Sequence, residues 1–405
     1  MRSGDEHSPC PERSPLHGPH ASGAGHTNWP PAATTPEPRA LQLLRRTPLT
    51  RFPYTAVHIE RNGQLPDSTF KVGLLAYGAI GDEHHRAIRS APGLTLTAVC
   101  DTNPDRISAA LAISPGLQTF TDADLMLEQS GIDLVIISTP PNSHFHWAHR
   151  ALTRGLNVIL EKPMALTTDQ CDELIALAKE KGLLLVVYQN RRYDQDFITL
   201  KSLIDRGDIG EVFSYESFVG GFSEPCALWH SMADVSGGAI FDWGSHFIDQ
   251  IMAVIPAKVQ SVSGLNQKRV WTHATNADHA QVTINFEGSV QASFINSDLA
   301  AARKPKFYVL GTRGAIVGDW DTSGTGAVAD LPAIITIHKN GTATHVPLMD
   351  RPALSFHASV GAYLQSGAAM PVTAEQSRDV VAIMQVAEES ALTAGALIRP
   401  TLISR

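Results

Sequence analysis

The part of the sequence that most restricts the fold runs from residue 70 to residue 190, where apolar runs alternate with helix-forming segments. Each run is short and rich in Val, Leu and Ile, which is typical of strands buried in a parallel sheet. Strands that alternate with helices form parallel sheets with right-handed crossovers. We therefore predict a doubly wound α/β domain with strands at residues 70–76, 94–101, 133–139, 157–163 and 183–189.

The segments between these runs carry the start and stop signals of helices. Asn103-Pro104 opens one helix, with proline near its first turn. Another segment ends at Gly155, and a third begins with Thr or Asp and ends at Gly182. These signals predict helices over residues 80–91, from 103 onwards, over 141–155 and over 167–182.

A different pattern begins at residue 191. Four longer segments alternate polar with apolar residues, and Gly288 marks a turn between the middle two: EVFSYESFVG, HAQVTINFE, SVQASFINS and KPKFYVLGT. Such alternation predicts a largely antiparallel sheet with one exposed face, and a helical stretch follows at about 374–395. The predicted fold class is α/β, with a Rossmann domain over 70–190 and a C-terminal α/β domain over 191–405.

The first 69 residues differ in composition from the rest of the chain. They hold 11 of the 25 prolines and form no sustained apolar face, so they cannot bury enough surface to offset chain entropy. We predict a disordered N-terminal extension over 1–69. The extension carries seven arginines and six acidic residues, so its charges nearly balance and it is not a basic arm. We favour a solvated tail or an upstream start codon over a tether or targeting segment.

The composition of the whole chain excludes several classes of protein. A length of 405 residues suits two domains, and the net charge of −8 argues against a nucleic-acid partner. The four cysteines lack the spacing of a disulfide scaffold or a zinc site, and no metal site is expected. No apolar run approaches the ~20 residues of a membrane span, and the N-terminus lacks a secretion signal. We expect a cytoplasmic protein.

A glycine-containing loop follows the first predicted strand. Residues 76–81 read Ala-Tyr-Gly-Ala-Ile-Gly, which is the pattern GxGxxG with alanine in first place. This pattern between a strand and a helix requires a tight turn, close approach of the backbone to a pyrophosphate, and close packing of helix on strand. The start of the helix adds N–H groups and a positive dipole. The loop predicts dinucleotide binding at Gly78, Ala79, Ile80 and Gly81.

The cofactor preference depends on Asp101, which ends the second predicted strand 20 residues after Gly81. A carboxylate there can accept hydrogen bonds from the adenosine ribose and repel a 2′-phosphate, which favours NAD. Arg106 weakens this preference for NAD, because it can face the 2′-phosphate of NADP or stack on adenine. Asp101 can also simply cap the helix that begins at Asn103. We therefore predict NAD, with NADP as the alternative.

Two further segments carry groups able to do chemistry. Lys162 follows a buried strand whose end should face the cofactor crevice, although a surface lysine is the ordinary alternative. Asp242 and His246 are four residues apart and share one face of a predicted helix. Histidine can accept the proton that an alcohol releases on oxidation. Taken alone, such a pair is more often a helix cap beside a core histidine.

Other candidate residues have weaker signals. His144, His146 and His149 lack accompanying carboxylates or cysteines at zinc-like spacing, so we interpret them as helix-surface residues, with His144 near the cofactor. Arg191 and Tyr193 line a substrate cleft or make contacts between the domains. Trp229, in a loop-like stretch, closes over a polyol or belongs to the core.

These motifs together resemble the glucose-fructose oxidoreductase / inositol dehydrogenase (Gfo/Idh/MocA) family, nearest its scyllo-inositol dehydrogenase branch. The resemblance covers about residues 70–320 and rests on VGLLAYGAIG, AVCDTNPDR, the stretch from DLVIISTPP to EKPMALT, VVYQNRRYDQDF, GDIGEV and SGGAIFDWGSHFIDQ. It implies a C-terminal domain built on an open, mostly antiparallel sheet that often forms the interface of a homo-oligomer, a dimer or tetramer. Ala76 departs from the family's first glycine.

The resemblance also implies roles for single residues. Lys162 matches a lysine that touches the nicotinamide ribose and the substrate, and Asp242 and His246 match a pair whose histidine accepts the proton. Thr139, Pro140, Asn142 and Glu161 match positions that contact the cofactor. The implied activity is reversible oxidation of a secondary alcohol on an inositol or sugar. An NAD-dependent glycosidase and a non-catalytic dinucleotide sensor are the alternatives.

Overall fold

A computed structural model describes residues 69–78, 80–322, 332–352 and 354–404. Residues 1–68, which make up nearly all of the predicted extension, lie outside the described residues, and so does Ala79. None of the helices in the described part of the chain is long and apolar enough to cross a membrane.

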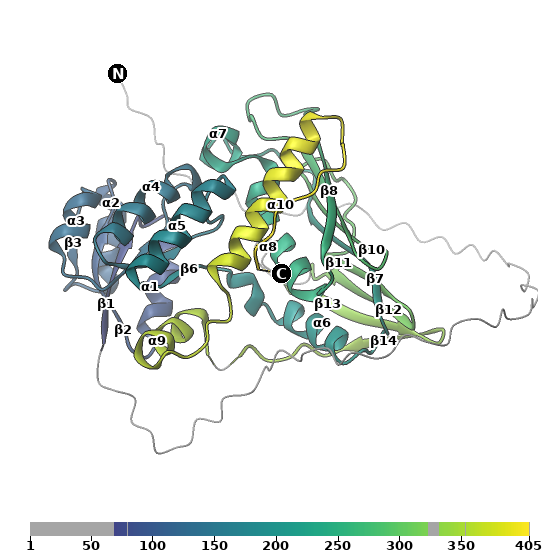
Figure 1. Ribbon diagram of the computed structural model, residues 1–405, viewed down its shortest axis with the longest axis horizontal. Coiled ribbons are helices and arrows are strands. Elements are labelled where there is room, and N and C mark those ends of the chain that lie inside the picture. The colour runs from purple at the N-terminus through teal and green to yellow at the C-terminus, as the bar shows by residue number, and fades with distance from the viewer. Residues whose placement is uncertain (1–68, 79, 323–331, 353, 405) are drawn as a thin grey trace, which may run out of the picture. The chain divides into compact units, whose positions relative to one another are not determined.

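Residues 70–187 form a six-stranded sheet with helices on both sides (Figure 1). Its elements are β1 Phe70–Leu75, α1 Gly81–Arg89, β2 Leu94–Cys100, α2 Pro104–Ile113, β3 Gln118–Phe120, α3 Ala123–Gln129, β4 Leu134–Ile137, η1 Pro141–Ser143, α4 His144–Thr153, β5 Asn157–Leu160, α5 Thr168–Lys181 and β6 Leu185–Val187. All strand pairs are parallel, in the order β3-β2-β1-β4-β5-β6. The prediction of a doubly wound sheet is confirmed.

The predicted helix signals act as expected. The side chain of Asn103 accepts a hydrogen bond from the Asp105 N–H at 2.8 Å, and proline occupies the first turn of α2. Gly182 ends α5 in the left-handed conformation, with φ of 65°. The strand order reverses between β1 and β4, and in such sheets ligands bind at the carboxyl ends of the strands beside that point.

The rest of the described chain builds an eight-stranded sheet and further helices, of which α9 at Phe356–Ser366 packs on the six-stranded sheet. Its elements are η2 Asn190–Tyr193, α6 Gln195–Asp205, β7 Val212–Gly220, η3 Trp229–Ser231, α7 Ala233–Ser236, α8 Ala239–Val254, β8 Val259–Gln267, β9 His279–Phe286, β10 Val290–Ser297, β11 Phe307–Gly311, β12 Gly314–Trp320, β13 Ala333–Lys339, β14 Thr342–Val346, α9 Phe356–Ser366 and α10 Ala374–Leu392. The strand order is β14-β13-β12-β11-β7-β10-β9-β8.

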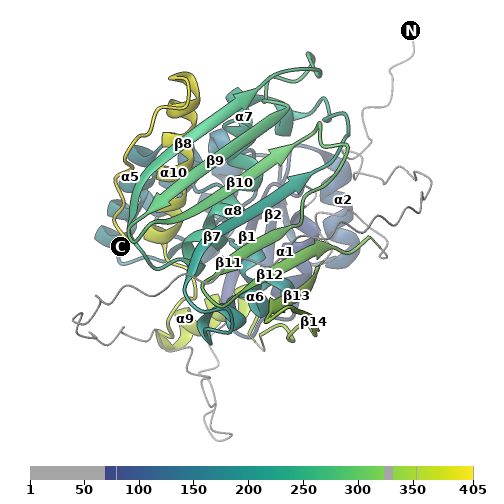
Figure 2. The same ribbon diagram turned by 90° about the vertical axis from the view of Figure 1, so that its right-hand side faces the viewer.

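The second sheet is mostly antiparallel, as predicted, with one parallel pair at its centre. Strands β7 and β10 run parallel because the chain crosses through α8 between them, and the alternation within each strand could not reveal that crossover. Figure 2 shows the sheet face-on, with α8 and α10 behind it. Phe247 of α8 stacks on Phe294 of β10 with ring centroids 5.5 Å apart, which fixes α8 against the inner face.

Helix α10 connects the two sheets. It contacts β8 and α8 on one side and α5 and β6 on the other. One continuous apolar core joins these elements, and Asp242 in the first turn of α8 reaches Lys162 at the end of β5. A second apolar cluster lies on the other side of that sheet, and α9 contributes Phe356 and Val360 to it.

Candidate active site

The glycine loop after β1 has the geometry that a dinucleotide needs. Ala76 takes the left-handed conformation with φ of 69°, so alanine makes the turn for which glycine is better suited. A methyl group on Gly78 would meet nothing within 4 Å, which leaves the backbone open to a ligand. A methyl group on Gly81 would lie 3.1 Å from the Tyr77 ring, so this glycine serves close packing. Ile80 directly precedes α1.

The strained turn at Ala76 gives a stability prediction. We expect Ala76→Gly to raise the free energy of unfolding by about 1 kcal/mol, because glycine adopts a positive φ without the steric cost that alanine bears. Urea unfolding followed by circular dichroism measures the change. The matched control is Ala109→Gly on the exposed face of α2. This substitution should lower the free energy of unfolding by about 1 kcal/mol. A loss at position 76 as well would contradict the account of the turn.

Asp101 is buried between the glycine loop and the start of α2. Its carboxylate accepts hydrogen bonds from the Tyr77 N–H at 2.7 Å and from the Asn103 N–H at 2.8 Å. Asn103, rather than Asp101, caps α2. The Arg106 guanidinium lies 3.5 Å from Asp101 and is half exposed. Asp101, which favours NAD, and Arg106, which suits NADP, therefore lie next to each other at the end of β2.

Lys162 and Asp242 come together although 80 positions separate them in the sequence. Lys162 follows β5, and its Nζ donates a hydrogen bond to Asp242 Oδ1 at 2.7 Å. Its Nζ also lies 3.4 Å from the Asp242 carbonyl, so it contacts the first turn of α8 twice. Both side chains remain partly exposed. An ammonium at the end of β5 is thus oriented by a carboxylate of the other sheet's helix.

His246 lies one turn further along α8 and is buried. Its Nδ1 has no hydrogen-bond partner among the described residues. Burial, followed by the charges of three nearby cations, holds the pKa of the imidazole well below its usual value; the cations are Lys162, Arg191 and Lys306. The ring is therefore neutral at neutral pH and able to accept a proton.

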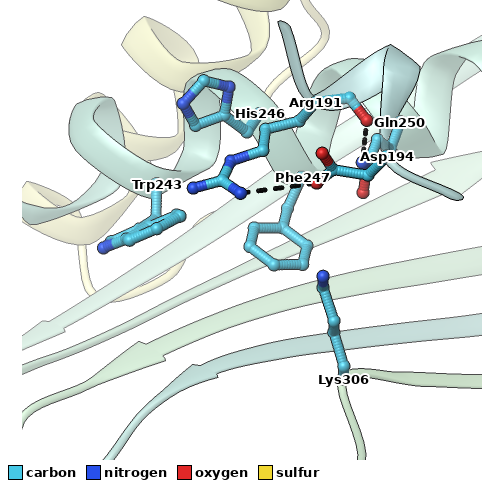
Figure 3. Close-up of a pocket in the computed structure, with 7 residues that line it drawn as sticks. All are labelled: Arg191, Asp194, Trp243, His246, Phe247, Gln250 and Lys306. Atoms are coloured by element: carbon cyan, nitrogen blue, oxygen red, sulfur yellow. Dashed lines mark hydrogen bonds and ion pairs between the residues drawn. The ribbon is translucent and has the colours of Figure 1, made fainter. Parts of the chain in front are cut away.

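A small cavity adjoins His246 (Figure 3). Its volume is about 10 Å³, at the lower limit for one water molecule. The Arg191 guanidinium lies over the Trp243 ring, 5.5 Å from its centre, and 3.5 Å from Asp194. The lining consists of Arg191, Asp194, Trp243, His246, Phe247, Gln250 and Lys306. Charged groups of both signs thus meet an aromatic face beside the candidate base.

Several of these lining residues were not predicted. Gln250 lies four residues after His246 on α8, so helical spacing could have found it. Lys306 is buried and pairs with Asp196 at 2.7 Å, but it precedes β11, far from any motif. Of the three residues predicted for the substrate, Arg191 lines the cavity, whereas Tyr193 and Trp229 do not. Trp229 instead stacks on His230, with ring centroids 3.6 Å apart.

The predicted cofactor contacts cluster where β4 and β5 end. Thr139, Pro140 and Asn142 lie between β4 and α4, and Glu161 follows β5. The interpretation of His144 as a helix-surface residue is wrong, because its side chain is fully buried. Its ring nitrogens lie 2.7 Å from the Pro163 carbonyl and 2.8 Å from the Thr139 carbonyl, so it joins the two strand ends. His144 shares one face of α4 with the buried Ala148, Ala151 and Leu152, so helical spacing could have signalled this burial.

The fold and the site define a class of protein: an NAD(P)-binding oxidoreductase with a Rossmann domain followed by an α/β domain that carries its own polar residues to the crevice. The model of the oxidoreductase family with an NAD-binding Rossmann fold matches residues 70–189, and that of the GFO/IDH/MocA C-terminal domain matches residues 197–317. The chain belongs to the Gfo/Idh/MocA family of oxidoreductases.

Individual relatives agree with this assignment. The scyllo-inositol 2-dehydrogenase (NADP(+)) of Bacillus subtilis is 27% identical over 81% of this chain and 95% of its own length. An uncharacterised oxidoreductase of Escherichia coli, YdgJ, is 31% identical over 61% of this chain and 70% of its own length. An NAD-binding protein from Listeria innocua superposes with a TM-score of 0.72 at 25% identity, covering 82% of this chain and 97% of that one.

Proposed function

We propose that the protein catalyses the reversible oxidation of a secondary alcohol of an inositol or sugar with a nicotinamide dinucleotide. The observation that carries the proposal is the 2.7 Å contact between Lys162 and Asp242 beside a buried, neutral His246. The similarity to a scyllo-inositol 2-dehydrogenase supports the polyol as substrate class.

The residues present suit a dinucleotide. The open backbone at Gly78 and the free N-terminus of α1 would hold the pyrophosphate, and Asp101 would hold the adenosine ribose. Thr139, Asn142 and Glu161 would hold the nicotinamide end. When bound, the nicotinamide ring supplies the hydride acceptor.

This chain's own residues would orient the alcohol and remove its proton. The Lys162 ammonium donates a hydrogen bond to the reacting oxygen and stabilises the negative charge that develops there. Asp242 keeps the ammonium in place through the 2.7 Å contact. His246 accepts the hydroxyl proton. Burial and the nearby cations lower the pKa of the imidazole, and the negative charge that develops on the reacting oxygen beside it favours the protonated ring. Holding the three groups in one geometry lowers the entropic part of the barrier.

The preferred dinucleotide in this proposal is NAD. Asp101 is buried and fixed by two backbone N–H groups, so its negative charge cannot easily move away from a 2′-phosphate. Arg106 lies within 3.5 Å and partly offsets that charge, which makes NADP the alternative. Tyr193 and Trp229 stay predictions as substrate contacts. A homo-oligomer formed through the eight-stranded sheet also stays a prediction, for which the molecular mass in solution is the test.

A spectrophotometric assay tests the proposed function. The purified protein is given NAD or NADP with a panel of inositols, aldoses and sugar acids, and the absorbance of the reduced nucleotide is followed. We expect reduction of NAD with a polyol. Reduction of NADP alone would preserve the enzyme and overturn the argument from Asp101.

The two alternative functions give different results in the same assay. A glycosidase that oxidises its substrate only transiently would hydrolyse a glycoside without net accumulation of reduced nucleotide. A sensor would bind the nucleotide and turn over nothing in the panel. Either result would contradict the proposed dehydrogenase.

A further inference from the structure

Two histidines from distant parts of the sequence meet inside the six-stranded-sheet domain, away from the cavity at His246. His84 belongs to α1 and His357 to α9, and 273 positions separate them. His84 Nδ1 lies 2.9 Å from His357 Nε2, and the exposed fractions of the two residues are 0% and 1%. Because one nitrogen must donate and the other accept, each ring restricts the protonation and the orientation of the other.

A hydrogen-bonded contact links this histidine pair to Glu161, the residue that precedes Lys162. His84 Nε2 lies 3.0 Å from Glu161 Oε1, and Glu161 Oε2 accepts a hydrogen bond from the Lys162 N–H at 3.1 Å. Burial acts to raise the pKa of Glu161, but the His84 hydrogen bond and the charges of His84 and Lys162 lower it overall. Glu161 is therefore an ionised carboxylate held on both oxygens.

Aromatic packing fixes the two imidazoles from the side. The Tyr188 ring lies 4.6 Å from that of His84 and 5.1 Å from that of His357, centre to centre. The Tyr188 hydroxyl donates to Glu83 at 2.7 Å, so this ring cannot rotate away without loss of a hydrogen bond. Helix α9 itself contacts α1 and β2 (Figure 1). Helix α9, from the C-terminal part of the chain, thus places His357 inside the domain of the six-stranded sheet.

We propose that His357 is a positioning residue that acts through His84 to hold Glu161 where the nicotinamide end of the dinucleotide binds. The six-stranded sheet holds the backbone of Glu161, whose N–H donates to the Ile137 carbonyl at 2.9 Å, but it leaves the two carboxylate oxygens to other partners. The chain His357–His84–Glu161–Lys162 fixes them from the far side of the domain. The proposal rests on the proposed function only in placing the nicotinamide at Glu161.

Two substitutions at the same position separate this role from simple packing. The amide of His357→Gln reaches the place of Nε2, which is the nitrogen that contacts His84, whereas the shorter amide of His357→Asn reaches only the place of Nδ1. His357→Phe keeps a ring but removes the polar contact. Val360→Ala weakens the same helix within the same apolar cluster and leaves His84 untouched, so it is the matched control.

The readout is the affinity for NADH or NADPH, whichever the wild type binds more tightly, measured without substrate by nucleotide fluorescence. We expect His357→Phe and His357→Asn to weaken binding about tenfold, the effect of one misplaced charged hydrogen-bonding group. His357→Gln should restore it to within about twofold, and Val360→Ala should leave it near the wild-type value. Thermal unfolding of each variant checks that it is folded.

Three results would overturn the proposal. They are wild-type affinity in His357→Phe, equal losses in His357→Phe and Val360→Ala, and equal affinities for the Gln and Asn variants. Each of these requires that the wild type binds nucleotide, so each leaves the proposed function standing. A wild type that binds neither nucleotide would overturn both proposals together.

Discussion

The His246→Gln variant should oxidise its alcohol substrate about 10²–10⁴ times more slowly than the wild type, because it loses the group that accepts the hydroxyl proton. Glutamine keeps the size and polarity of the side chain, so the buried environment of α8 is preserved. Nucleotide affinity should change by less than about twofold, since His246 is assigned to the substrate side of the crevice. Steady-state kinetics and fluorescence titration give the two numbers.

The same residue sets the expected pH dependence of the wild type. Histidine acts as a base only when neutral, and burial with nearby cations holds the pKa of His246 well below 6.5. The value of kcat/KM for oxidation should therefore stay level as pH falls to 6.5 and decline only in more acidic solution. The control is His345→Gln, which replaces an exposed histidine of β14 and should leave both the oxidation rate and its pH profile unchanged. An unaltered rate in His246→Gln would exclude His246 as the base.

Lys162→Met should lower kcat/KM by about 10²–10³, because it removes the cation that stabilises charge on the reacting oxygen. Methionine fills similar space, so the end of β5 need not collapse. The substitution also removes the 2.7 Å hydrogen bond to Asp242. The matched control is Lys304→Met, which breaks an exposed lysine–carboxylate pair with Glu216 and should have little effect.

A double substitution tests whether Lys162 and Asp242 act as one unit. If Asp242 serves to orient the ammonium, Lys162→Met with Asp242→Asn should be hardly slower than Lys162→Met alone. Independent roles would instead give losses that multiply. Multiplying losses would contradict the assignment of Asp242 as the residue that orients the ammonium.

The parts of this structure that could be predicted from sequence are those set by local patterns. The buried strands around β1 and β4, the cap at Asn103 and the left-handed Gly182 follow from rules that involve a few neighbouring residues. Strand β3 escaped prediction because it has only three residues, none of them buried. Strand β14 is almost wholly exposed, so its sequence shows no alternation of polar and apolar residues.

The candidate site was partly predictable for a related reason. Lys162, Asp242 and His246 each belong to a motif, so a resemblance could carry them, and the structure brings Lys162 to Asp242. Lys306 and His357 belong to no motif, and each reaches its partner only through the tertiary fold. His144 was misplaced because the spacing of metal ligands, rather than the buried face that it shares with Ala148, Ala151 and Leu152, decided the prediction.

The most direct test of the account follows the hydrogen that leaves the substrate. The wild-type protein is incubated with an inositol that carries deuterium on its ring carbons and with the oxidised nucleotide, and the reduced nucleotide is analysed by mass spectrometry. We expect the nucleotide to gain the deuterium while a ketone accumulates. Turnover of substrate with no deuterium in the nucleotide would contradict hydride transfer from the carbinol carbon, and with it the central claim.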